Sequence, residues 1–272
     1  MKIRAYLSLF RIQTIADLQY RLAALAGATT SIFWALIEIT IFTVFYTYSD
    51  RTDAGLQAGL SLRQVVSYVW LGQLLYLMLP IAVDSEIQAK IESGDVSLEL
   101  VRPINLYTHW FTKIAARRIT PLCWRGLTVI IAGLCMPQAY RFGPPASLEG
   151  FLWTLMAIFS ALFLATAFGC LLCAIRLSID WGNGPIYMLV LIGQVFSGSY
   201  LPLQLWPQTW QRWLFLQPFA GYLDIPCRLY VGSMPEQAAA VILLQWFWIA
   251  VFVILGKLLM AKQLARIIVQ GG

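Results

Sequence analysis

The chain has 272 residues, of which 60% are hydrophobic and only 12% are charged, with 19 Lys and Arg against 13 Asp and Glu. So few charged side chains do not suffice to solvate a globule of this length, which excludes a water-soluble enzyme or binding domain. The net charge of +6 would suit nucleic acid, but the basic residues gather in short segments between apolar blocks, so we expect no nucleic-acid partner.

Six apolar blocks divide the sequence, and most approach or exceed the roughly 20 residues that a spanning helix needs. The fold class predicted from them is an all-α polytopic membrane protein with six transmembrane helices. The expected organisation is a cytoplasmic amphipathic helix over 1–22, a transmembrane domain over 23–260 and a cytoplasmic tail over 261–272. The expected spans are about 25–48, 65–83, 119–140, 150–175, 185–203 and 237–256.

The distribution of basic residues orients these six spans. Threading them through a bilayer puts thirteen of the nineteen Lys and Arg residues on the side that holds both termini. Five lie on the other side, and Arg125 falls inside a span. Because basic residues accumulate on the cytoplasmic side, we expect both termini in the cytoplasm.

Residues 2–22 come before the first span and have the pattern of a helix lying on the membrane. Apolar side chains recur on one helical face, and basic residues flank that face. This segment is either a positively charged topology anchor or a strut that links a cytoplasmic partner to the first span. The apolar residues are Ile3, Leu7, Phe10 and Leu18, and the basic ones are Lys2, Arg4, Arg11 and Arg21.

The segment between the second and third spans predicts a short amphipathic helix. Ile87 and Ile91 share one face, charged residues occupy the others, and Gly94 is suited to end the helix in the left-handed conformation. We expect the apolar face to pack into a groove of a soluble partner and the charges to set the register. The alternative is an ordinary interfacial loop helix. The candidate contact residues are Glu86, Ile87, Lys90, Ile91, Glu92, Gly94, Arg102 and Pro103.

An aromatic cluster follows the fifth span. Trp206, Trp210 and Trp213 fall at positions i, i+4 and i+7, a pattern typical of the headgroup level of a bilayer. Pro218 and Phe219 follow in a long, largely apolar connection that several prolines interrupt. We expect short re-entrant helices here, covered by protein where their backbone is broken. The alternative is an aromatic belt alone.

The fourth span carries a ridge of small residues at four-residue spacing. In lipid, small side chains let helix backbones approach closely. The ridge turns by about 40° per step, because four residues overshoot a 3.6-residue turn, so it suits a crossing contact. Its members are Ala157, Ala161, Ala165, Gly169 and Cys173.

Glu38 is the one carboxylate placed deep in an expected span. A charge there costs about 2.5–3.5 kcal/mol, so the side chain should face protein or a polar pathway. We consider two roles, lining a transport pathway or bonding between helices, and place Arg125 too shallow to be its preferred partner. Gln73, Gln194 and Gln245 are further pathway candidates, able to supply neutral hydrogen bonds in either role.

Two absences in the sequence narrow the chemistry. No G-x-x-x-x-G-K-[ST] motif occurs, so the chain itself has no loop for cradling ATP phosphates. His109 is the only histidine, which excludes a Ser–His hydrolase and a multi-histidine metal site at membrane depth. We therefore expect no catalytic residues and no cofactor bound by this chain.

Two stretches resemble ABC-2-type permeases, the membrane subunits of ATP-driven exporters. They are IESGDVSLELVRPINLY, residues 91–107, and GQVFSGSYLPLQLWPQTWQRWLFLQPFAGYLDIPCRLYVG, residues 193–232. The first is similar to the family's first cytoplasmic loop, and the second to its fifth helix and the element that closes the outer end of the pathway.

This resemblance implies a pair of permeases, homo- or heterodimeric, each docked through that loop on a cytoplasmic ATPase subunit that holds ATP and Mg. It also implies a bacterial cytoplasmic (inner) membrane, with lipid around the chain. Two other functions stay open, a stand-alone channel or ion-coupled carrier and a membrane scaffold. The cargo is open too, because drug, lipid, peptide, glycan and ion exporters share these features.

Overall fold

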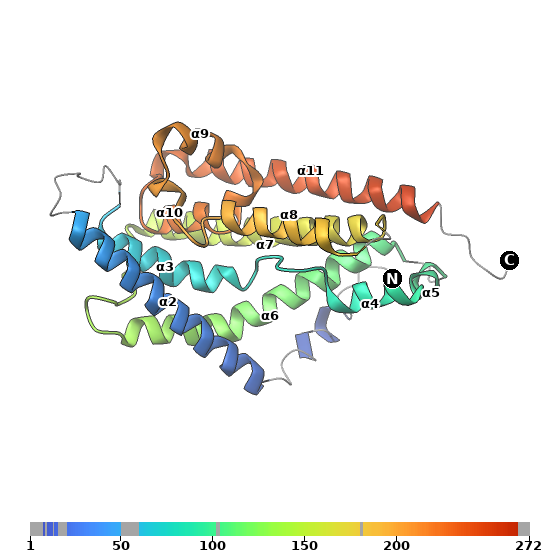
Figure 1. Cartoon of the computed structure of the whole chain (residues 1–272), viewed down its shortest axis with the longest axis horizontal. Helices are drawn as coiled ribbons and strands as arrows, with labels where there is room; N and C mark the ends of the chain where they lie inside the picture. The colour runs from blue at the N-terminus through green and yellow to red at the C-terminus, as the bar shows by residue number, and fades with distance from the viewer. Residues whose placement is uncertain are drawn as a thin grey trace.

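The molecule is an elongated bundle of helices lying side by side (Figure 1). Every regular element in the part that the structure describes is a helix, and no strand occurs there, which confirms the all-α prediction. The computed structural model describes residues 8, 10–12, 14–15, 21–49, 60–101, 104–179 and 182–265.

Short helices mark the two ends of the bundle. Helices α4 (Ser85–Ser93) and α5 (Val96–Leu100) lie at one end, here called the α4 end. Helices α9 (Gln208–Leu216) and α10 (Asp224–Tyr230) lie at the other, the α9 end (Figure 1).

Four helices are long and apolar enough to cross a membrane. Their lengths of 27 to 30 residues correspond to roughly 40 Å or more, which exceeds a hydrocarbon core of about 30 Å. This finding agrees with a multi-pass membrane protein. The helices are α2 (Arg21–Ser49), α6 (Leu106–Cys135), α7 (Leu148–Arg176) and α11 (Ala238–Leu264).

The second and fifth expected spans are shorter helices. Helix α3 (Leu62–Tyr76) has 15 residues and α8 (Gly184–Phe196) has 13. At about 1.5 Å per residue they reach only about 22 and 20 Å, less than the hydrocarbon thickness. Helix α3 ends at Tyr76, and the chain from 77 to 84 follows as turns and bends. Pro80 lies within this stretch and does not continue a helix. The count of six spans therefore stays a prediction.

Helix α6 begins well before the third expected span. Asn105 caps it by accepting a hydrogen bond from the Thr108 amide at 3.0 Å, so the helix starts at Leu106 instead of near 119. Its first half carries Lys113, Arg117 and Arg118. These three charges exclude the segment from a span that is predicted from apolar residues alone. Two of these cations pair with acidic residues around α4, and that pairing makes an extended helix tolerable.

Helix α7 forms the centre of the bundle, with 78% of its most apolar window buried. The small residues of its ridge are buried, and its packing against α11 is the most extensive between any two described helices. On α11, the Gln245 side chain donates to the Ala157 carbonyl at 3.2 Å and to the Gly221 carbonyl at 2.7 Å. The ridge thus works as a packing surface, as predicted.

Short helices fill the connection from α8 to α11. Besides α9 and α10 they are the single turns η1 (Leu203–Leu205), η2 (Pro218–Gly221) and η3 (Pro235–Gln237). All residues of α10 are buried, so protein covers this broken stretch of backbone. The amphipathic helix expected over 2–22 lies mostly outside the described residues and stays a prediction.

We predict that Ala157→Leu destabilises the bundle, because its Cβ is fully buried where α7 meets α11. Overpacking of this kind costs about 1–3 kcal/mol, or about 2–4 °C of Tm per kcal/mol in a chain of this size. Thermal unfolding in detergent measures it. Met156→Phe adds volume on the exposed face of the same helix and serves as the control. Equal Tm values for the two variants would contradict the packing role.

Candidate functional site

Local signals in the sequence fix helix α4 at both ends. Asp84 caps its start by accepting a hydrogen bond from the Ile87 amide at 3.1 Å, and Glu86 in the first turn suits the helix dipole. Gly94 ends the helix with φ +80°, as predicted. A turn then leads into α5, and in it the Ser97 amide donates a hydrogen bond to the Gly94 carbonyl at 3.2 Å.

A set of ion pairs fastens α4 to helix α6. Lys113 Nζ lies 2.5 Å from Glu86 Oε1, and Arg117 reaches both Glu86 Oε2 at 2.9 Å and Asp84 Oδ2 at 2.5 Å. Partial burial alone would raise the pKa of Glu86, but the bonds and charges of Lys113 and Lys90 outweigh it and lower the pKa to about 2. Glu86 therefore stays ionised at physiological pH, and the pairs persist. We call this set the α4 clamp.

Two further contacts extend the α4 clamp to neighbouring elements. Glu99 of α5 accepts from Lys90 Nζ at 2.7 Å and from the Trp110 indole of α6 at 2.8 Å. Glu92 pairs with Arg176 at the end of α7, at 3.2 Å. Helix α4 is thus tied to α5 and to the two long helices α6 and α7.

The apolar face expected to contact a partner points the other way. Ile87 is 0% exposed and packs in the chain's own core, and Ile91 is half-buried against it. For Ile87 that expectation is wrong, because a short helix between spans also needs an anchor within its own bundle. The exposed apolar side chains at this end are instead on and after α5, where Leu98 is 65% and Val101 is 83% exposed.

The other predicted contact residues are divided between the clamp and the surface. Glu86 and Lys90 are in the clamp, Glu92 is exposed yet paired with Arg176, and Gly94 is exposed at the helix end. Arg102 and Pro103 lie outside the described residues.

Glu38 and Gln73 come together inside the bundle. The Gln73 amide donates to Glu38 Oε1 at 3.2 Å across α2 and α3. Beside them is a cavity of about 10 Å³, also lined by Tyr68, Tyr76 and Tyr200, with space for about one water molecule. Among the described residues, no bond joins Glu38 to Arg125.

The remaining two pathway candidates lie in different places. Gln194 is next to the Glu38 cavity, since its Oε1 accepts from the Tyr200 hydroxyl at 3.2 Å. Gln245 is 1% exposed between α7 and η2 and bonds to backbone carbonyls, which is a structural position.

A buried ion pair near the α9 end was missed by the reading of the sequence. Asp224 is 0% exposed, and its Oδ2 lies 2.6 Å from Arg228 Nε one helical turn later. Its Oδ1 accepts from the Tyr68 hydroxyl of α3 at 2.9 Å and from the Leu203 amide at 3.0 Å. The available signal was an Asp and an Arg spaced i, i+4 inside an otherwise apolar run. This Asp224 lock ties α10, α3 and the turn after α8 together.

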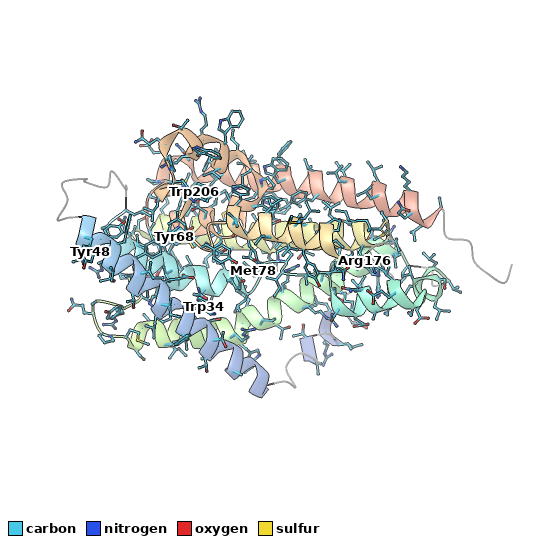
Figure 2. All side chains as sticks on the ribbon, viewed as in Figure 1. Trp34, Tyr48, Tyr68, Met78, Arg176 and Trp206 are labelled. Carbon is cyan, nitrogen blue, oxygen red and sulfur yellow. The ribbon has the colours of Figure 1, made fainter. Side chains whose placement is uncertain are left out.

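The predicted outer gate residues divide into two groups. Trp210 and Trp213 of α9 are exposed, at 57% and 74%, as suits a headgroup layer. Trp206 packs near Phe196, with ring centroids 6.4 Å apart. Pro218 begins η2, and the Phe219 ring lies inward against Phe168 of α7 at 5.4 Å. Figure 2 shows Trp206 and Tyr68 toward this end, Met78 midway and Arg176 at the α4 end.

Comparison with family models gives a match that spans nearly all of these helices. The matching model describes an ABC-2 family transporter protein and covers residues 28–271. The chain belongs to the ABC-2 transporter family. Comparisons with curated proteins and with solved structures gave no match.

The family match places the α4 clamp, the Glu38 cavity and the Asp224 lock inside one transporter membrane region. The end of α4, all of α5 and the start of α6 fall in residues 91–107, the stretch that resembles the family's first cytoplasmic loop. The family assignment is therefore consistent with the sequence motifs, whereas the roles of the individual site residues rest on their geometry.

We predict that Asp224→Asn strongly destabilises this ABC-2 family chain, because it leaves the Arg228 charge buried and unpaired. Breaking a buried pair in this way costs about 3–5 kcal/mol. The double variant Asp224→Asn, Arg228→Met removes both charges and should recover most of the loss. Glu149→Gln, at an exposed carboxylate, is the control. Thermal unfolding in detergent compares these proteins and the single variant Arg228→Met, and strictly additive losses in the double variant would refute the lock.

Proposed function

We propose that the chain is the permease subunit of an ABC exporter, which moves a substrate out of the cytoplasm with ATP hydrolysed by a separate subunit. The α4 clamp is the observation that carries this proposal. It joins a short helix at the tip of the bundle to α6 and α7 through the charges on Glu86 and Glu92. A cytoplasmic ATPase subunit that moves the long helices needs a contact of this kind, through which it acts on them.

The proposed contact with the ATPase subunit centres on α5 and the residue after it. Leu98 and Val101 present apolar surface at the tip, with Leu100 37% exposed beside them. Exposed apolar patches rimmed by charge are typical of protein interfaces. The neighbouring Glu92, Lys90 and Gln88 would set the register. ATP and Mg would then be bound by the partner, since this chain has no phosphate-binding loop.

The same arrangement supports a proposal for the orientation of the chain and for the number of permease subunits. We place the α4 end on the cytoplasmic side of a bacterial inner membrane. This orientation puts Lys90, Lys257 and Lys262 on the side where basic residues accumulate. We further propose a pair of permeases, identical or related, with the pathway between them. The cavity at Glu38 holds only about 10 Å³, so Glu38 does not line a cargo-sized space within this subunit alone.

Two functions of other classes compete with this proposal. A stand-alone channel or ion-coupled carrier would use Glu38 without any ATPase subunit. A membrane scaffold would need the exposed α5 tip but no pathway. The family match weighs against both, because it describes a transporter membrane component.

We predict that the paired change Leu98→Asp, Val101→Asp uncouples the ATPase subunit. Charges placed in a desolvated contact should weaken its affinity at least tenfold, as loss of an interface anchor commonly does. Copurification of the candidate ATPase and ATP hydrolysis by the complex are the measurements. Leu148→Asp makes the same chemical change at a 77% exposed site at the opposite end and should have no effect. Normal copurification of the paired variant would place the docking surface elsewhere.

We predict that Glu38→Gln reduces transport of cationic cargo and leaves assembly and ATP hydrolysis unchanged. A Gln side chain still accepts the bond from Gln73, so the helix contact is kept while the charge is lost. Transport of a panel of organic cations into inverted vesicles tests the change, with Glu149→Gln as the control. Unaltered transport across the panel would assign Glu38 to interhelical bonding alone.

A further inference from the structure

Helix α3 ends inside the bundle, well short of the α4 end. The chain leaves the helix after Tyr76 and runs without regular structure to α4, a path visible in Figure 1. In a membrane, such a break is tolerated only where protein or a polar group satisfies the freed backbone. The residues that surround this break form a pocket.

Arg118 of α6 reaches the break and is incompletely satisfied there. Its Nη1 donates to the Met78 carbonyl, while its Nε is buried without a hydrogen-bond partner. Within the described residues Arg118 makes no ion pair, unlike its neighbour Arg117, which is held by Asp84 and Glu86. The Arg117 charge is therefore neutralised, whereas the Arg118 charge has only the more distant Asp84 carboxylate to compensate it in part.

Helix α7 leaves room for this side chain at Gly169. A methyl group there would lie 2.7 Å from Arg118 Nη2, closer than any ordinary contact. The guanidinium thus lies directly across the α7 backbone, about 10 Å before the helix end at Arg176 by the rise of about 1.5 Å per residue.

The pocket at this break has a volume of about 210 Å³. That is many times the roughly 10–15 Å³ that one water molecule requires. Its polar groups are Asp84, Arg117 and Arg118, and most of its remaining lining is aliphatic. Ile81, on the unstructured segment, is 56% exposed at the pocket. The lining of the pocket therefore combines two guanidinium groups and one carboxylate with aliphatic side chains.

We propose that this pocket binds the anionic headgroup of an amphiphile, with phosphate on Arg118 and the hydrocarbon chain along Ile81. A guanidinium suits phosphate because its fork donates two parallel bonds, and burial strengthens the attraction. Basic pockets between transmembrane helices are a recurrent place for anionic lipid headgroups. The site needs neither the ATPase subunit nor the Glu38 pathway.

Native mass spectrometry of the detergent-purified full chain tests the site with two lipids of identical acyl chains, phosphatidylglycerol and phosphatidylcholine. We expect phosphatidylglycerol to be retained at least tenfold better, the scale of one charged hydrogen bond. Arg118→Gln should abolish the preference, since the side chain stays polar but carries no charge. Lys257→Gln removes one charge at the same end, outside the pocket, and should keep the preference.

A second variant tests the same pocket while leaving Arg118 and its bond to the Met78 carbonyl unchanged. Ile81→Asp places a negative charge at an exposed position of the pocket and should also abolish the preference. Equal retention of the two lipids by the unaltered chain would overturn the proposal, as would an unchanged preference in Arg118→Gln. If the chain binds inorganic phosphate but shows no preference between the two lipids, the proposal of an amphiphile is wrong and the pocket is a site for a soluble anion.

Discussion

The lack of water inside a bilayer imposes one requirement on this chain, which is that broken backbone and buried charge be satisfied within the protein. The structure meets both needs at the same places. Where α3 ends, Arg118 donates to the freed Met78 carbonyl. Where the chain turns after α8, Asp224 accepts from the Leu203 amide. Both of these interruptions are thus fastened by a charged side chain from another element.

Helix α7 connects these points along the length of the bundle. The predicted turn of about 40° between successive small residues makes each one face a different neighbour. Ala157 meets Gln245 of α11 toward the α9 end, whereas Gly169 accommodates Arg118 of α6 nearer the α4 end. Arg176 then joins the helix to Glu92. One densely packed helix therefore has contacts with both ends of the bundle.

The features that were predictable from the sequence are those that depend on local physics. The apolar blocks identified the helical fold, Gly94 predicted a left-handed helix end, and the small-residue spacing predicted close packing. Periodicity reports that a helix has an apolar face but not what covers it, so the inward position of Ile87 was not predictable. The Asp224–Arg228 pair was missed because Arg228 lies between the fifth and sixth expected spans, where the count of basic residues by side accounts for it without any partner.

The α4 clamp shows why position in a network matters more than the number of ion pairs. An exposed pair alone contributes about 0–1 kcal/mol, so no single bond here fixes α4. Glu86, however, is held by Lys113 and Arg117 at once, and Lys113 is itself 4% exposed. Moving α4 away from α6 would strand that buried ammonium, which is far more costly than losing a surface pair. Under the proposed function, we therefore expect a load on α4 to shift α4 together with α6.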